Sequence, residues 1–92
     1  MSTTLRRPPA VPTHLQATIR GNVVRLRTAG GLSAPELSTL AGLSATAVYQ
    51  IEAGHSPASL GTLAALAEAL GVTVADLVSP TKPSQKTISR KI

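Results

Sequence analysis

The sequence predicts an all-α domain of five short helices joined by short connections. The first observation is a local pattern that recurs four times: an apolar residue, then Ser or Thr, then another apolar residue four positions further on. A hydroxyl in this place caps a helix N-terminus, and the apolar pair around it forms a hydrophobic staple. The second observation is a glycine after three of these segments, which is typical of helix C-termini. The third is that no strand-like alternation of any length appears.

The helices are placed in order by these signals. The first is expected over roughly residues 14–29, because Ile19, Val23 and Leu26 repeat at i, i+4 and i+7 and therefore share one face. Gly30 and Gly31 end it. The other four helices begin at their capping hydroxyls: near 33–41 at Ser33, near 44–53 at Ser44, near 59–70 at Ser59 and near 73–78 at Thr73.

Carboxylates and glycines support these boundaries. Glu36 and Asp76 stand three positions after Ser33 and Thr73, as in a capping box. The glycines just past the predicted ends of three helices are Gly42, Gly54 and Gly71.

Composition limits both the size and the chemistry of the domain. The 92 residues suffice for one small domain, and without Trp or Phe, and with the single Tyr49, its core must be aliphatic. So small a core gains from dimerisation. The absence of Cys excludes a disulfide framework, a thiol nucleophile and a Cys-ligated zinc site. His14 and His55 stand far apart without an acidic cluster, and the serines lack a His–Asp constellation. We expect no enzyme activity, no metal and no cofactor.

The net charge of +5 is carried by the ends of the chain. Residues 18–79 hold three Arg and four acidic residues, a net of −1, whereas residues 1–17 add +2 and residues 80–92 add +4. We expect a flexible basic arm over 1–13, a helical domain over 14–79 and a disordered basic tail over 80–92. Basic arms favour polyanions such as nucleic acid, although solubilising disorder explains the same composition. No apolar run approaches the ~20 residues of a membrane span, and the absence of Cys fits a reducing cytoplasm, where we expect the protein.

The second and third predicted helices are joined by the segment AGLS, residues 41–44. A short glycine-containing turn between two short helices is the helix-turn-helix pattern. From Ile19 to Val78 the chain resembles the Cro/phage-repressor (XRE-type) helix-turn-helix family, which implies a lambda-repressor-like fold. The resemblance is carried by Leu-Arg at 26–27, Leu-Ser at 32–33, Ile-Glu-Ala-Gly at 51–54, Ser-Leu-Gly-Thr-Leu at 59–63 and Leu-Ala-Glu-Ala-Leu-Gly-Val at 66–72.

The resemblance implies a sequence-specific, nucleoid-associated regulator that binds double-stranded DNA as a dimer and inserts the helix over 44–53 into the major groove. Base reading is expected at Ala45, Thr46 and Gln50, and Gln50 can bond adenine N6 and N7. Phosphate or backbone contacts are expected at Ser33, Ala34, Ser44, Tyr49, His55, Ser56, Arg20 and Arg25. The resemblance also pairs Arg27 with Glu52 as a structural ion pair, and removing one partner of a buried pair costs about 3–5 kcal/mol.

The sequence departs from the family where polar readers are common. Many members carry Gln at the positions matching Ala34 and Ala45, or a basic residue in the reading helix, whereas here Gln50 is the main polar reader. These residues also have non-functional interpretations. Tyr49 could pack against the helix over 33–41 or a partner, and the side chains of Gln50, Arg20 and Arg25 could simply be solvated. The alternative function is an antitoxin-like or accessory module that binds a protein partner through the domain and its C-terminal tail.

The resemblance implies a dimer surface on the helix over 73–78 and the end of the helix before it. Val74, Leu77 or Val78 would then be exposed enough to pair with a second copy. The alternative is that all three close the core.

Overall fold

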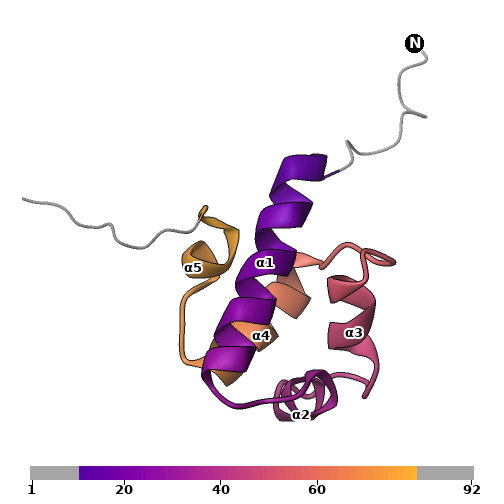
Figure 1. Ribbon diagram of the computed structural model, residues 1–92, viewed down its shortest axis with the longest axis vertical. Helices are drawn as coiled ribbons and strands as arrows, with labels where there is room; N and C mark the ends of the chain where they lie inside the picture. The colour runs from indigo at the N-terminus through magenta and orange to yellow at the C-terminus, as the bar shows by residue number, and fades with distance from the viewer. Residues whose placement is uncertain (1–10, 81–92) are drawn as a thin grey trace, which may run out of the picture.

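The computed structural model describes residues 11–80, which form five helices and, within that range, no strand. The helices are α1 (Thr13–Ala29), α2 (Ala34–Leu40), α3 (Ala47–Glu52), α4 (Leu60–Leu70) and α5 (Val74–Val78). The predicted all-α architecture is confirmed (Figure 1). Most of the expected arm over 1–13 and of the expected tail over 80–92 lies outside the described residues.

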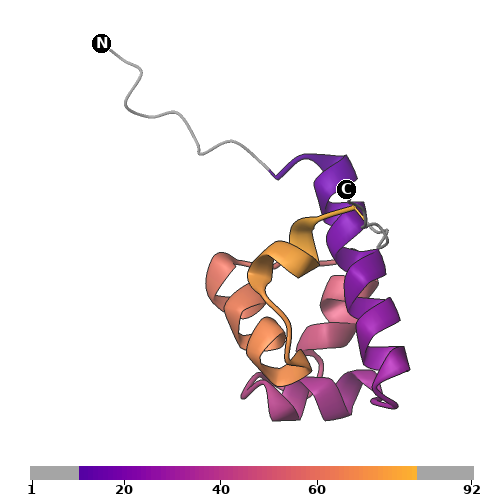
Figure 2. The same ribbon diagram turned by 90° about the vertical axis from the view of Figure 1, so that its left-hand side faces the viewer.

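The helices enclose one core with α1 along its length. α1 packs against α5 and α3, α2 against α3 and α4, and α4 against α5. α5 and α3 lie on opposite sides of α1 in Figure 1, and in Figure 2, where that view is turned by 90°, α5 lies in front of α3. The buried apolar side chains are Ile19, Val23, Leu37, Val48, Ile51, Leu63, Leu66, Ala67 and Leu77. α2 and α3 therefore pack against each other, with α3 on the side of α1 away from α5 (Figure 1).

Three of the four predicted helix caps are present. The hydroxyls of Ser33, Ser59 and Thr73 accept hydrogen bonds from the backbone N–H three residues later, at 3.0–3.1 Å. Glu36 and Asp76 complete capping boxes by accepting from the backbone N–H of Ser33 and Thr73, at 2.8 and 2.9 Å. These bonds form within one helical turn, which is why the residues alone predict them.

The two capping-box carboxyls should make the domain less stable in acid. The bonds from Ser33 and Thr73 hold the pKa of Glu36 and of Asp76 below their ordinary values. A carboxyl whose pKa is lower in the folded state stabilises the fold above its unfolded pKa, and this contribution is lost as the pH falls through the folded pKa. Urea midpoints should therefore fall between about pH 5 and pH 3, and fall less in a Glu36→Gln, Asp76→Asn double variant. An equal fall in both proteins would contradict this assignment.

The prediction for the start of α3 is wrong. Ser44 was expected to cap a helix beginning at once, but residues 45–46 form a turn and α3 begins at Ala47, with Thr46 at the N-cap position making no side-chain cap bond. The backbone N–H of Val48 is bonded instead by the hydroxyl of Ser38 on α2, at 3.0 Å. Ser38 is fully buried and donates its own hydroxyl proton to the carbonyl of Ala34. A neighbouring helix thus supplies the cap that the local sequence was expected to supply.

The turn between α2 and α3 depends on Gly42. Its φ of +76° lies in the left-handed region that L side chains avoid. In this conformation the N–H of Leu43 bonds back to the carbonyl of Ser38 at 2.9 Å. The turn therefore closes α2 and redirects the chain toward α3 within a few residues.

Asn22 joins α1 to α5 from inside the domain. It is 2% exposed, and its Nδ2 lies 2.8 Å from the carbonyls of Leu77 and Ser79 and 3.2 Å from that of Asp76. These carbonyls at the end of a five-residue helix would otherwise lack partners from the helix itself. One buried amide thus secures the C-terminal helix.

Part of the expected dimer surface belongs to the core. Leu77 has no exposed area, so it cannot pair with a second copy while the domain stays folded. Val74 and Val78 are half-buried. The reason is that Asn22 draws α5 onto α1 with Leu77 on the inner side.

Candidate nucleic-acid interface

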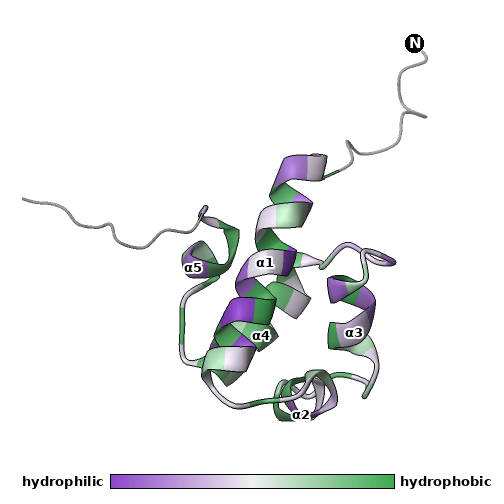
Figure 3. Ribbon diagram, viewed as in Figure 1, coloured by the Kyte–Doolittle hydropathy of each residue, from purple (hydrophilic) through white to green (hydrophobic). Residues whose placement is uncertain are grey.

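The outer side of α3 and of the turn before it is exposed and uncharged. Val48 and Ile51 are buried in the core, as their spacing predicts. Ala45, Thr46 and Tyr49 are exposed and Gln50 is half-buried. Figure 3 shows the resulting division of α3, with hydrophobic residues toward the domain and hydrophilic ones outward. Burial of its apolar side therefore fixes which residues α3 can offer to a partner.

Gln50, Tyr49 and His55 form one cluster on this outer side. The chain turns back after α3, and the backbone N–H of His55 donates to the carbonyl of Gln50 at 2.9 Å. The His55 ring then returns to the helix, with Nδ1 3.1 Å from Gln50 Oε1. The rings of Tyr49 and His55 meet edge to face, with centroids 6.1 Å apart and planes at 81°. The main expected base reader is thus held by the loop that follows its helix.

Arg27 and Glu52 form a two-pronged ion pair between α1 and α3. Arg27 Nε lies 2.7 Å from Glu52 Oε2, and Arg27 Nη2 lies 2.8 Å from Glu52 Oε1. Arg27 Nη1 also donates to the carbonyl of Leu32, at 3.1 Å. The bond to Glu52 raises the pKa of Arg27, so the guanidinium stays charged. The pair implied by the family resemblance is present, and it ties α3 to α1 and to the loop before α2.

The expected backbone-contact residues surround α3 from two loops. Ser44 is exposed in the turn before α3, and His55 and Ser56 are exposed in the loop after it. Ser33 is exposed at the start of α2, but its backbone N–H already donates to Glu36, so the amide is engaged inside the protein. Ala34 is half-buried and packs against the core.

The structure separates the two expected phosphate arginines. Arg20 is half-buried on α1, and its guanidinium lies beside Gly54 in the loop after α3. Arg25 lies beside Asn22, with Nη2 3.1 Å from Asn22 Oδ1, at the contact of α1 with α5. Arg20 is therefore next to the α3 region, whereas Arg25 supports the amide that holds α5.

Ser38 and Asn22 were not recognised from the sequence. Ser38 supports the start of α3, and Asn22 supports the placement of α5. A polar residue on an otherwise apolar helix face was the available signal, because buried polar groups require hydrogen-bond partners. That signal does not reveal which partners are used.

In helix-turn-helix DNA-binding proteins, the second helix of the motif packs on the domain with one side and exposes the other to DNA. Here α3 is that helix, bonded to α1 through Glu52 and exposed on its outer side. The sequence profile described as helix-turn-helix matches residues 24–77. The chain belongs to the Cro/phage-repressor (XRE-type) helix-turn-helix family, and it is a DNA-binding transcription regulator.

Solved structures support this assignment. The chain is 30% identical to a hypothetical transcription factor from Neisseria, with a TM-score of 0.70, covering 84% of this chain and 91% of that one. It is 34% identical to the restriction-modification controller protein C.AhdI from Aeromonas hydrophila, with a TM-score of 0.64, covering 67% of this chain and 94% of that one. A comparison with curated proteins finds no match.

Proposed function

We propose that this protein is a sequence-specific bacterial DNA-binding regulator that inserts α3 into the major groove as part of a dimer. The observation that carries the proposal is the state of α3. Its apolar side is buried, Glu52 is held by Arg27, and Ala45, Thr46, Tyr49 and Gln50 remain on the outside. Such a protein acts by binding at the nucleoid, in the cytoplasm. In the described range, no helix has the length and apolar character to cross a bilayer.

The proposed base-reading surface on α3 is small and uncharged. We therefore assign sequence specificity to α3 and most of the electrostatic affinity for DNA to other parts of the chain. A direct base contact contributes about 1–3 kcal/mol of discrimination, and Gln50 is the main polar side chain able to make one. Ala45 and Thr46 offer methyl groups to thymine, and Thr46 also offers a hydroxyl. The cations that neutralise DNA phosphates are then Arg20 and the basic residues of 1–17 and 80–92.

Gln50→Ala and deletion of residues 80–92 should have different effects on DNA binding. The Gln50 variant should lose about five- to 100-fold in discrimination at the base pair it reads, with little change in salt dependence. The deletion removes four cations, so it should weaken binding to all sequences and flatten the dependence of affinity on salt. The measurement is binding to sites selected from a random DNA pool, at two salt concentrations.

The result that would reject the proposal is a full-length chain that selects no sequence over competitor DNA. If deletion of residues 80–92 leaves DNA binding unchanged, the tail is assigned to a protein partner instead.

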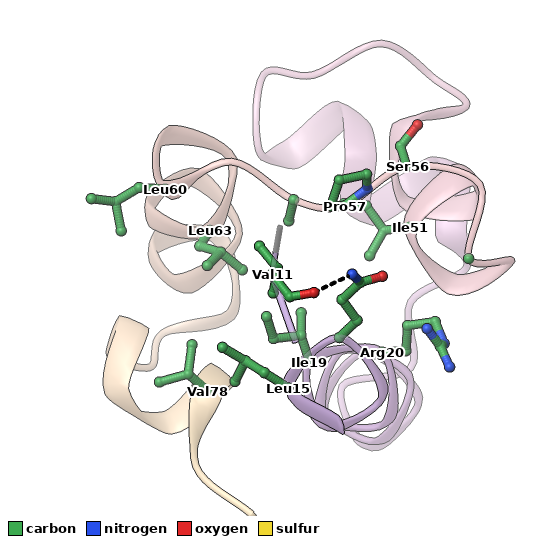
Figure 4. A pocket seen from close by; sticks show the side chains of 13 residues that line it. Val11, Leu15, Ile19, Arg20, Ile51, Ser56, Pro57, Leu60, Leu63 and Val78 are labelled. Carbon is green, nitrogen blue, oxygen red and sulfur yellow. Dashed lines mark hydrogen bonds between the residues drawn. The ribbon is translucent and has the colours of Figure 1, made fainter. Parts of the chain in front are cut away.

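We place the dimer contact at the side of the domain that carries α5. A cavity of about 220 Å³ extends from α5 across α1 and the start of α4 to Ile51 of α3 and the loop after it, and its lining is chiefly apolar. Figure 4 shows Leu15, Ile19, Leu63 and Val78 around it, with Leu60 beside them. Leu60 is 72% exposed, which is unfavourable for a leucine in water. Pairing through Leu60 and α5 leaves the outer side of α3 available for a half-site, because Ile51, the α3 residue that lines the cavity, is on its buried inner side.

Leu60→Ser should weaken the dimer without unfolding the domain. The side chain is mostly in water, so the substitution should change the free energy of unfolding by no more than about 0.5 kcal/mol. The dimer dissociation constant should rise by about ten-fold or more, as for an apolar anchor of an interface. Sedimentation equilibrium measures this, with Leu40→Ser as the matched control, since Leu40 is 62% exposed but belongs to α2. Equal dissociation constants for wild type and Leu60→Ser would exclude this surface.

A further inference from the structure

We propose that His55 is a positioning residue that determines which end of the Gln50 carboxamide reads DNA. The proposal rests on the proposed function and names a specificity determinant for the same surface. With Oε1 turned to the His55 ring, Gln50 presents its NH₂ group outward and reads base edges that offer acceptors, guanine O6 and N7 above all. This differs from the adenine contact expected of a glutamine with both amide atoms available.

Two independent contacts hold His55 where it can do this. Its backbone N–H is bonded to the Gln50 carbonyl, and that bond belongs to the turn that ends α3. Its ring is steadied by the edge-to-face contact with Tyr49. With the ring held in this way, Nδ1 lies 3.1 Å from Gln50 Oε1 at the exposed surface.

The chemistry of the two groups links the amide orientation to the imidazole proton. A carboxamide oxygen only accepts, so an imidazole nitrogen facing it must carry a proton. Nδ1–H donating to Oε1 therefore leaves the Gln50 NH₂ group as the outward end, and no described residue bonds that group. An imidazolium that also touches a phosphate through Nε2 keeps Nδ1–H toward Gln50, so the orientation is the same in the charged form.

Adenine recognition needs both ends of the amide at once, with Oε1 accepting from N6 and the NH₂ group donating to N7. In this protein Oε1 is held toward His55, so the base edge is left with the donor alone. Guanine, with two acceptors in the major groove, is the base that a donor reads best.

The experiment compares His55→Phe with His55→Asn in the full chain. Phe keeps a ring against Tyr49 but has no donor, whereas the Asn side-chain NH₂ can replace Nδ1–H. The base pair that Gln50 reads is identified first, as the one at which Gln50→Ala loses discrimination. Wild type and His55→Asn should prefer guanine there over adenine by at least about five-fold, and His55→Phe should lose this preference. Discrimination at other positions should not change, and loss of a phosphate contact by the imidazole would affect both variants alike, because both remove it.

A second measurement tests the orientation without DNA. The ¹⁵N shifts of neutral His55 should report a proton on Nδ1 in the wild type, and a proton mainly on Nε2 in Gln50→Ala. A wild-type His55 protonated on Nε2, a preference for adenine at the Gln50 position, or a His55→Phe profile equal to wild type would each overturn the inference. If the chain selects no DNA sequence, the proposed function is rejected. The ¹⁵N measurement then tests separately whether Nδ1–H of His55 orients the Gln50 amide.

Discussion

Glu52→Ala is expected to lower the free energy of unfolding by about 2–4 kcal/mol, because it leaves the Arg27 guanidinium at the α1–α3 contact without its counter-charge. The side chains of Arg27 and Glu52 are 21% and 13% exposed, so water compensates part of the loss. The expected cost is therefore somewhat below the roughly 3–5 kcal/mol of fully buried pairs. A domain of about 70 residues has roughly 4–10 kcal/mol of stability in total. The loss is therefore a large fraction of the total, and the variant should unfold at a clearly lower urea concentration.

Urea unfolding of the two single variants and of the double variant measures this pair. Arg27→Ala and Glu52→Ala together should cost less than the sum of the single losses, because the second substitution removes a charge that the first left unpaired. Glu68→Ala is the matched control, since Glu68 is exposed on α4 and its replacement should stay within about 0.5 kcal/mol. A Glu52→Ala protein as stable as the control would show that the pair does not hold α3.

Asn22→Ala is expected to cost about 2–3 kcal/mol and to loosen α5 before the rest of the domain unfolds. The substitution removes the donor to the carbonyls of Asp76, Leu77 and Ser79, of which the bond to Leu77 is fully buried, and an unsatisfied buried group costs about 1–3 kcal/mol. α5 has only five residues and cannot be stable by itself. The proposed dimer should weaken as well, because Val78 belongs to the same helix.

Urea unfolding measures the loss, and hydrogen exchange at the Ser79 amide, which bonds to Ala75, reports on α5 separately. Arg25→Ala is the control, because it removes the neighbour of Asn22 Oδ1 but leaves the amide donor in place. That variant should lose less than about 1 kcal/mol. Unchanged exchange in α5 of Asn22→Ala would contradict the role given to this residue.

The sequence contained most of the fold because its signals are local. A capping hydroxyl and the N–H that it accepts are three residues apart, and the apolar residues of one helix face recur every three or four positions. The caps of α2, α4 and α5 and the burial of Val48 and Ile51 were predictable for this reason. The partner of Arg27 was not predictable from spacing, and only the family resemblance identified Glu52.

The local rule failed at α3, where the cap is not the nearest hydroxyl. Ser44 has the right type and spacing, yet the buried Ser38 on α2 bonds the Val48 N–H across the turn. The outer face of α3 was still predicted, since it depends on burial of Val48 and Ile51 and not on where the helix begins.

By itself, the sequence determined the helices, their order, their inner faces and the small neutral face of α3. The tertiary structure alone decided that Ser38 caps α3, that Asn22 holds α5, and that His55 engages the oxygen of Gln50. The physical reason is the separation along the chain between the two bonded groups. Bonds within one helical turn follow from residue type and spacing, whereas bonds between separate elements depend on which surfaces packing brings together. The specificity proposed for Gln50 belongs to the second kind.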